Sequence, residues 1–321
     1  ATLVGTPPNL SFARIANIIF PAMPEISFAD WLVFAIWISI LVFIAAWILL
    51  FVMYKPKHPW DGVNRKEFKK EYQLLGKAKP EEKIIFVLFI LMALLWVFRA
   101  GFHIGGFDLP GWSELFAYPA YINDGTVAIL ISVILFVIPS KSNKGERLMD
   151  WETANRLPWH IVILFGGGFA LAKGFVDSGL SVWFGEQLSG LAGTHPMILT
   201  SVIVTMMSFL TELTSNIAST EMILPILAGM AVSIQINPLL LMIPATLAAS
   251  LAFMLPVATP PNAIIFGTGK ITIRDMVKTG FLLNMVGVII TTLVTYYWGT
   301  LVFKIDVGSF PDWATTLTGG G

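Results

Sequence analysis

The side chains best suited to binding chemistry form one polar run, from Phe209 to Glu221, inside a long apolar stretch. Its hydroxyl and amide oxygens are neutral ligands for a hard cation, and free N–H groups at the start of the next helix attract an anion. One run could therefore hold both charges. The alternative is that the hydroxyls bond back to helix carbonyls, although so polar a run between apolar arms needs partners.

A second pattern is repeated. Thr6, Pro7, Pro8 and Asn9 recur as Thr259, Pro260, Pro261 and Asn262. Proline has no N–H and a fixed φ, so a helix ending before it leaves carbonyls free, while Pro fits the first turn of the next helix. The carbonyls of Gly5 and Ala258 could then bind sodium, as in discontinuous transporter helices. Two ordinary kinks are the alternative, which the duplication disfavours.

Composition places these motifs in a membrane. The 321 residues are 56% hydrophobic and only 12% charged, which excludes a soluble domain. Several apolar stretches approach or exceed the ~18 residues typical of a spanning helix: Trp31 to Tyr54, Ile84 to Arg99, Met197 to Leu210, Leu239 to Leu255 and Phe281 to Phe303. We therefore expect an all-α, multi-pass protein whose surroundings are a lipid bilayer, in a plasma or bacterial inner membrane.

Several classes of site are disfavoured. The net charge is zero, which gives no general attraction for nucleic acid, and there is no cysteine to form disulfides, thiolate metal sites or nucleophiles. The four His are scattered without ligand spacing. Nor is there a nucleophile and base pair, a metal cluster or a cofactor loop, so we expect no enzyme, no cofactor and no metal other than sodium.

The arms of the polar run predict a re-entrant hairpin over about 196–236. Pro196 to Leu210 and Met222 to Ile236 are each about fifteen residues long, whereas a comfortable crossing needs about 20. A polar tip at membrane depth is tolerated only where protein buries it or water reaches it.

Positive charge predicts the orientation of the helices. Nine Lys and Arg lie between Lys55 and Lys83, and four between Lys141 and Arg156, so loops 55–83 and 140–158 are expected in the cytoplasm. The helix after the first Thr-Pro-Pro-Asn thus runs inward. Basic residues after the second copy make its helix run outward, with the C-terminus outside. The two copies of Thr-Pro-Pro-Asn thus precede helices that run in opposite directions, which predicts an inverted repeat. Capping pairs, Ser27 with Asp30 and Thr272 with Asp275, should start both helices.

Two further features have structural and functional interpretations. Glu212 and Glu221 are acids near membrane depth and could belong to a proton relay, but for Glu212 we favour a hydrogen-bonded structural role. The triplet Gly166 to Gly168 suggests a phosphate loop, yet no strand precedes it and no Gly-Lys-Ser/Thr follows. Close helix packing is the favoured interpretation.

Four longer motifs resemble those of the divalent anion/sodium symporter family: Thr211 to Asn216, Phe253 to Ala263, Asp275 to Gly280, and Phe310 to Ala314. The resemblance covers essentially the whole chain. It implies a homodimeric elevator transporter that carries di- or tricarboxylates, or in some branches sulfate, together with sodium. Each half of such a transporter supplies a hairpin tip bearing Ser-Asn-Thr and a broken helix.

The resemblance also implies roles for individual residues. Substrate contacts are expected from Thr6, Ser215, Asn216, Thr259 and Pro260. Sodium contacts are expected from Gly5, Thr211, Thr214, Asn216 and Ala258, with Thr214 acting through its backbone. Ile217 replaces the third residue of Ser-Asn-Thr, which we expect to affect substrate preference. The first tip is missing, so counterparts of residues 158–255 are expected to precede Ala1.

The expected domains follow from these assignments. Residues 1–30 would end a first transport repeat, and 31–157 would form scaffold and dimerisation helices. Residues 158–275 would form the second transport repeat, with its hairpin and a broken helix over 239–268. Residues 276–321 would form a last scaffold helix and an outside tail.

The predicted function is sodium-coupled symport of a small dianion, most simply succinate, malate or fumarate. Because no Lys or Arg stands at the site, hydroxyls, the Asn216 amide, N–H groups and bound sodium must hold the anion. Sodium should bind first. The alternatives are a sodium-independent dicarboxylate exchanger, a sulfate or citrate transporter of the same fold, and, in a different class, a passive anion channel.

Overall fold

The computed structural model describes residues 1–55, 65–104, 107–143 and 145–315. The regular elements of these residues are helices, apart from one antiparallel hairpin of short strands, β1 (Phe102–Ile104) and β2 (Phe107–Leu109). The expected helical class is therefore confirmed, with this hairpin as an addition. Part of the predicted 55–83 loop and the end of the predicted tail lie outside the described residues.

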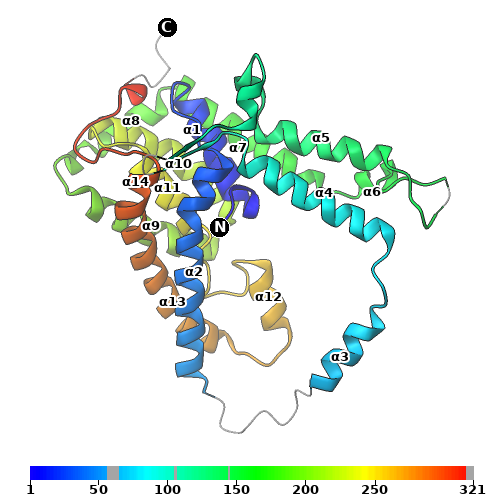
Figure 1. Ribbon diagram of the computed structural model, residues 1–321. Coiled ribbons are helices and arrows are strands. Elements are labelled where there is room, and N and C mark those ends of the chain that lie inside the picture. The colour runs from blue at the N-terminus through cyan, green and yellow to red at the C-terminus, as the bar shows by residue number, and fades with distance from the viewer. Residues whose placement is uncertain (56–64, 105–106, 144, 316–321) are drawn as a thin grey trace. The chain divides into compact units, whose positions relative to one another are not determined.

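The chain forms two compact units (Figure 1), residues 1–53 with 160–321, and residues 54–159. The first unit contains α1 (Pro7–Ile19), α2 (Phe28–Met53), α7 (Trp159–Asp177), α8 (Leu180–Gln187), α9 (Pro196–Leu213), α10 (Asn216–Ser233), α11 (Leu239–Ala248), α12 (Pro260–Gly267), α13 (Ile273–Val294), α14 (Thr300–Val302) and 3-10 turns at Leu3–Gly5, Ser189–Leu191 and Asp312–Ala314. The second contains α3 (Arg65–Leu74), α4 (Pro80–Val97), β1, β2, α5 (Asp124–Val137), α6 (Trp151–Asn155) and 3-10 turns at Trp112–Leu115 and Pro119–Tyr121.

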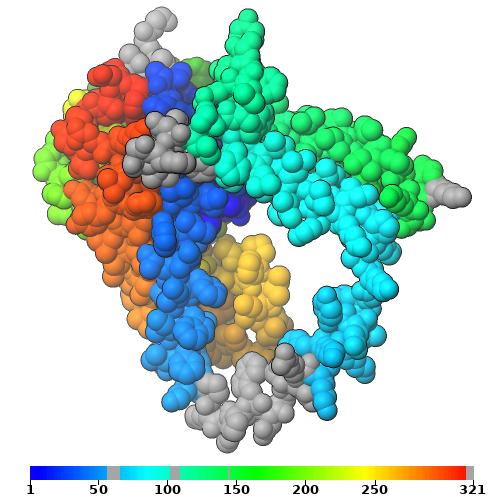
Figure 2. All heavy atoms as spheres, viewed as in Figure 1, coloured from blue at the N-terminus to red at the C-terminus, as the bar shows by residue number. Residues whose placement is uncertain are grey.

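Five stretches among the described residues are long and apolar enough to cross a membrane: α2, α7, α9, α10, and α13 continued through the π-helical turn Thr295–Gly299 into α14. Helix α2 exposes large apolar side chains such as Phe43, Trp47 and Val52 along its second half, which is uncovered on the face seen in Figure 2. A surface of this kind suits lipid rather than water.

The predicted span Leu239 to Leu255 is wrong in its extent. Helix α11 ends at Ala248, and residues 249–259 are not helical until α12 begins at Pro260. Helix α11 is buried along almost its whole length, because α9, α10, α13 and α1 surround it. Its apolar character on every side reflects that burial rather than contact with lipid.

Glycine allows the closest helix contact of the first unit, between α8 and α10. A Cβ at Gly229 would overlap the Ser181 carbonyl, and a Cβ at Gly185 would overlap the Gly229 carbonyl. Small residues let helix backbones approach in this way. Helix α10 also packs on α1, whereas α9 packs mainly on α11 and α13.

Both predicted capping pairs are present. Ser27 Oγ donates to Asp30 Oδ2 at 2.6 Å and accepts from the Asp30 N–H at 3.1 Å. Thr272 Oγ1 likewise donates to Asp275 Oδ2 at 2.6 Å and accepts from the Asp275 N–H at 3.2 Å. Each pair satisfies N–H groups that the first helical turn leaves free.

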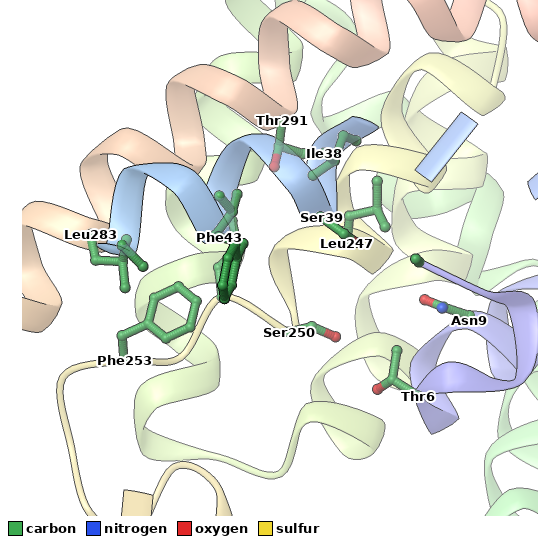
Figure 3. Close-up of a pocket in the computed structure, with 14 residues that line it drawn as sticks. Thr6, Asn9, Ile38, Ser39, Phe43, Leu247, Ser250, Phe253, Leu283 and Thr291 are labelled. Carbon is green, nitrogen blue, oxygen red and sulfur yellow. The ribbon is translucent and has the colours of Figure 1, made fainter. Parts of the chain in front are cut away.

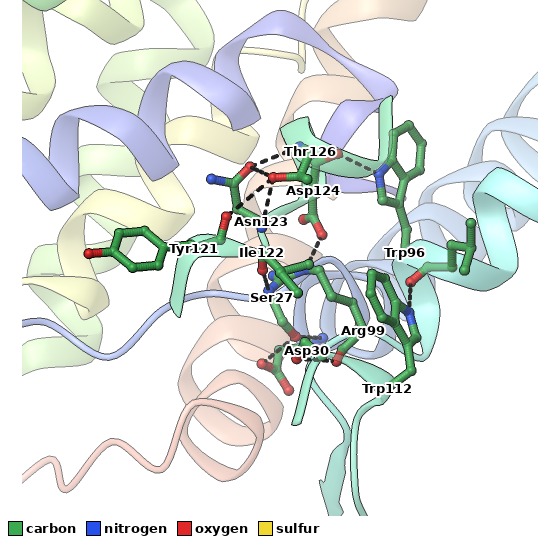
Figure 4. Close-up of polar contacts among 12 residues, drawn as sticks. Ser27, Asp30, Trp96, Arg99, Trp112, Tyr121, Ile122, Asn123, Asp124 and Thr126 are labelled. Atoms are coloured by element: carbon green, nitrogen blue, oxygen red, sulfur yellow. Dashed lines mark hydrogen bonds and ion pairs between the residues drawn. The ribbon is translucent and has the colours of Figure 1, made fainter. Parts of the chain in front are cut away.

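In the second unit, a buried arginine joins α4 to α5 (Figure 4). Arg99 is 2% exposed, and its Nε donates to Asp124 Oδ1 at 2.6 Å while its Nη1 donates to the Ile122 carbonyl at 3.0 Å. The indole N–H of Trp96 donates to the Asp124 carbonyl at 2.9 Å. The end of α4 and the start of α5 are thus held by one group of polar contacts.

A carboxylate at the other end of α4 holds a loop. Glu81 accepts hydrogen bonds from the backbone N–H groups of Lys141 and Ser142 at 2.6 and 2.7 Å, and from the hydroxyls of Ser140 and Ser142 at 3.0 and 2.8 Å. These bonds, above all the one from the Ser142 N–H, lower the pKa of Glu81 to about 2. The charged acceptor therefore persists at every physiological pH, and the contact is lost only as the pH falls through about 2.

We predict that Arg99→Ala destabilises the protein by about 3 kcal/mol, because the change removes the buried guanidinium that donates to the Asp124 carboxylate and the Ile122 carbonyl. Thermal unfolding in detergent measures the loss. The control is Arg156→Ala, whose ion pair with Glu152 has side chains 72% and 78% exposed and should contribute below about 1 kcal/mol. Equal effects of the two changes would contradict a structural role for the buried pair.

Candidate functional site

The polar run forms a tight turn between two helices. Helix α9 ends at Leu213 and α10 begins at Asn216, so only Thr214 and Ser215 lie between them. Each arm has 18 residues rather than the predicted fifteen. Part of the run is helical, and two of its hydroxyls bond to helix carbonyls: Thr214 Oγ1 donates to Leu210 at 2.9 Å and Thr220 Oγ1 donates to Asn216 at 2.8 Å. For these two hydroxyls, the interpretation as bonds to helix carbonyls is correct.

Three oxygens converge beside this turn. The buried Thr211 Oγ1 lies 2.5 Å from Asn216 Oδ1 and 2.8 Å from the Ala249 carbonyl oxygen. Asn216 is half-buried at the start of α10, and Ala249 follows the end of α11. The turn therefore brings a hydroxyl, an amide and a carbonyl from three segments together, and all three are neutral oxygen donors of the kind a hard cation accepts.

The non-helical segment after α11 is held by side chains. Ser208 Oγ donates to the Leu251 carbonyl at 3.0 Å, and Asn262 Nδ2 donates to the carbonyls of Ala252 and Leu255 at 2.9 and 3.0 Å. Glu212 accepts from three consecutive backbone N–H groups in the same segment. Its predicted hydrogen-bonded structural role is confirmed.

The two copies of Thr-Pro-Pro-Asn have the same local geometry. Thr6 has φ −151° and ψ 142°, and Thr259 has φ −145° and ψ 150°, each immediately before a helix that starts with Pro. Asn9 Nδ2 donates to the Thr2 carbonyl at 3.0 Å, as Asn262 Nδ2 does to Leu255, seven residues back in both cases. Both breaks are thus the same structural unit.

The residues directly before the two breaks, Gly5 and Ala258, also make matching backbone hydrogen bonds. The N–H of Gly5 donates to the Thr2 carbonyl at 3.0 Å, and the N–H of Ala258 donates to the Leu255 carbonyl at 3.2 Å. Gly5 is exposed and Ala258 half-buried. Each residue therefore ends a turn of the same kind directly before a Thr-Pro-Pro sequence.

A cavity of about 390 Å³ lies beside the first break. Its polar lining comes from Thr6, Asn9, Ser39, Ser250 and Thr291, and Figure 3 shows Thr6, Asn9 and Ser250 turned toward one shared space. Within the described part of the chain, the oxygens Asn9 Oδ1, Ser250 Oγ and Thr291 Oγ1 are buried without a hydrogen-bond partner. Of the predicted site residues, Thr6 lines this cavity.

The remaining predicted residues lie at the turn and at the second break. Ser215 is exposed and Thr259 half-buried, and neither side chain caps the helix that follows it. Pro260 is exposed at the start of α12. The structure thus places Thr211, Asn216 and Ala249 in contact, and leaves the hydroxyls of Ser215 and Thr259 without a capping bond.

One contact between the first break and the hairpin escaped the sequence analysis. Ser11 Oγ on α1 donates to Glu221 Oε1 on α10 at 2.9 Å in a buried position. Gly168 of α7 lies against the same carboxylate, where a Cβ would overlap it, whereas Gly166 and Gly167 face open space. Close packing is therefore correct for Gly168 alone. The sequence signal of this contact was Glu221 itself, an acid at the end of the polar run.

Comparison with known proteins identifies the family. Residues 1–305 match the model of the sodium:sulfate symporter transmembrane region. The chain belongs to this family. The predicted family is thereby confirmed, a transporter family rather than an enzyme family, and the apolar helices among the described residues fit a multi-pass membrane protein.

Individual relatives are similar over nearly the whole chain. The sodium-dependent dicarboxylate transporter SdcS of Staphylococcus saprophyticus is 42% identical over 308 residues, which cover 95% of this chain. Proteins of the same name from Staphylococcus aureus, strains MW2 and COL, are 44% identical over 308 residues. The chain spans 57% of the length of these relatives.

We predict that Asn262→Ala destabilises the segment 249–259 by about 1 kcal/mol, because it removes the side-chain donor to the partly buried carbonyls of Ala252 and Leu255 and leaves Leu255 with the bond from the Ala258 N–H. Hydrogen exchange followed by mass spectrometry should show faster exchange in peptides covering this segment. Asn143→Ala is the control, since the Asn143 side chain donates to the exposed Glu146 and the substitution keeps its backbone bond to Ser140. Unchanged exchange in Asn262→Ala would show that the bonds do not hold the segment.

Proposed function

We propose that this chain is part of a sodium-coupled symporter of small dianions, with C4-dicarboxylates such as succinate, malate and fumarate as its substrates. The observation that carries the proposal is the cluster of neutral oxygens from Thr211, Asn216 and Ala249 at the turn of the hairpin. The relatives named sodium-dependent dicarboxylate transporters support it.

The sodium half of the site uses oxygens near this cluster. We propose that Thr211 and Asn216 bind the ion through their side chains, and that Thr214 and Ala258 contribute backbone carbonyls. Thr214 is suited to a backbone role because its hydroxyl already donates to Leu210. Gly5 would present the matching carbonyl of the first break, as its equivalent turn suggests.

The anion half uses groups that carry no full charge. Ser215 and Thr259 have hydroxyls that cap no helix. Thr6 is the counterpart of Thr259 at the first break, and Pro260 directly follows Thr259. Because none of these groups is cationic, a dianion bound here gains most of its electrostatic stabilisation from sodium held nearby. Sodium then binds before the substrate, and release of the substrate follows the loss of sodium.

We infer an elevator mechanism built on an inverted repeat. The shared geometry of the two Thr-Pro-Pro-Asn breaks supports the repeat, with loops 55–83 and 140–158 in the cytoplasm and the C-terminus outside. By contact, α2 and α13 group with the hairpin and not with α4 and α5, unlike the division expected from sequence. Because contact in one conformation does not identify the moving body, we propose that residues 1–30 and 158–275 move, and that 31–157 and 276–321 supply the static frame and the homodimer contact.

The family description favours one alternative substrate, sulfate, on the same fold. Sulfate and dicarboxylates are both small dianions, so the mechanism is the same. Competition of each anion with labelled succinate discriminates between them, as it does for citrate. Counterflow of succinate without sodium would indicate an exchanger, and an ohmic current would indicate a channel.

We predict that proteoliposomes containing the full-length protein accumulate labelled succinate only with an inward sodium gradient, because sodium completes the anion site. The measurement compares equal gradients of sodium and potassium. Undiminished uptake in potassium alone would overturn the symport proposal.

We further predict that Asn216→Ala reduces sodium-driven uptake to the level of empty vesicles, because the change removes the amide shared by the sodium and substrate halves. Thr205→Ala is the matched control, since Thr205 on the same arm donates only to the Ser201 carbonyl and should keep near-normal uptake. Normal transport by Asn216→Ala would remove the turn from the site.

A further inference from the structure

Glu212 accepts hydrogen bonds from the backbone between α11 and α12. The side chain lies on the last turn of α9 and is 3% exposed. Its Oε1 accepts from the N–H groups of Phe253 at 2.7 Å and Met254 at 2.9 Å, and its Oε2 accepts from the N–H of Leu255 at 3.0 Å. One carboxylate thus receives three successive backbone donors from a segment that has no helical hydrogen bonds of its own.

Asn284 of α13 fixes the orientation of this carboxylate. Asn284 is fully buried, and its Nδ2 donates to Glu212 Oε1 at 2.9 Å. Helix α13 can approach because residue 280 is glycine, where a Cβ would overlap the Phe253 carbonyl. The segment is therefore held on one side by α9 and on the other by α13.

The segment held in this way leads directly to Ala258. The Ala258 N–H donates to the Leu255 carbonyl at 3.2 Å, so the position of Leu255 sets the start of the turn that presents the Ala258 carbonyl. Thr211, the neighbour of Glu212, contacts both Asn216 and Ala249. Two adjacent residues of α9 thus fix the position of the hairpin turn relative to the backbone on the other side of the proposed sodium site.

We propose that Glu212, oriented by Asn284, is a positioning residue that sets sodium affinity by holding the Ala258 carbonyl in register with Thr211 and Asn216. The inference rests on the proposed sodium-coupled function. Glu212 itself contacts neither ion nor substrate. Its carboxylate acts on the site through the three N–H groups alone.

The test compares Glu212→Gln and Asn284→Ala with wild type in the full-length protein. Glu212→Gln keeps the size of the side chain but presents an NH₂ group to backbone donors. The loss of a hydrogen bond to a charged group predicts that half-saturating sodium rises about tenfold or more, while maximal succinate uptake at saturating sodium is retained. Asn284→Ala should raise half-saturating sodium less, by about threefold, because the three backbone bonds remain.

Thr200→Val is the matched control. Thr200 also lies buried on α9 and donates to a backbone carbonyl, that of Leu240 at 3.0 Å, but at the start of α11 and far along the chain from the break. Its loss should leave half-saturating sodium unchanged. The second readout is the thermal stabilisation by sodium in detergent, which reports binding without transport.

The outcomes separate the two proposals. Sodium-independent uptake by wild type would overturn the proposed function. Sodium-dependent uptake by wild type with unchanged half-saturation in Glu212→Gln, or equal shifts in Thr200→Val, would overturn the positioning role. If Glu212→Gln does not fold, the test rests on Asn284→Ala. A wild-type sodium response in that variant would then overturn the inference.

Discussion

The interrupted backbone between Ala248 and Pro260 has to find hydrogen-bond partners where water is scarce, and much of the first unit is arranged around that requirement. An unsatisfied N–H or C=O group in an apolar surrounding costs several kcal/mol. Helix α9 supplies these hydrogen-bond partners from one polar face. Four of its side chains bond to backbone groups of α11 and the segment after it: Thr200, Ser208, Thr211 and Glu212. The break is tolerable because its neighbour is polar on that side.

The same requirement explains why binding groups and structural groups are interleaved. Thr211 and Glu212 are consecutive residues, yet one faces a cluster of oxygens and the other a row of N–H groups. Side chains that satisfy a broken helix and side chains that could ligate an ion are therefore of the same types, and sequence alone separates them poorly. Thr214 and Thr220 illustrate this, since their hydroxyls bond to helix carbonyls.

What could be predicted from the sequence was local. The two breaks follow from proline chemistry, and the capping pairs at Ser27 and Thr272 follow from residues three apart. Contacts between distant segments were beyond reach: Glu212 meets Asn284 across 72 positions and Ser11 meets Glu221 across 210. The end of α11 at Ala248 was missed for a related reason, because apolar residues continue to Leu255 and hydropathy does not register where tertiary partners replace the helical hydrogen bonds.

The glycine contact between α8 and α10 has a mechanical consequence. Because the Ser181 carbonyl lies directly against Gly229, no layer of side chains separates the two backbones at this point. Axial slip of one helix past the other would drive a carbonyl into a neighbouring Cβ. Helices α8 and α10 should therefore move together as one body, whereas α9 contacts α11 and the segment after it through separate side-chain hydrogen bonds that can break singly.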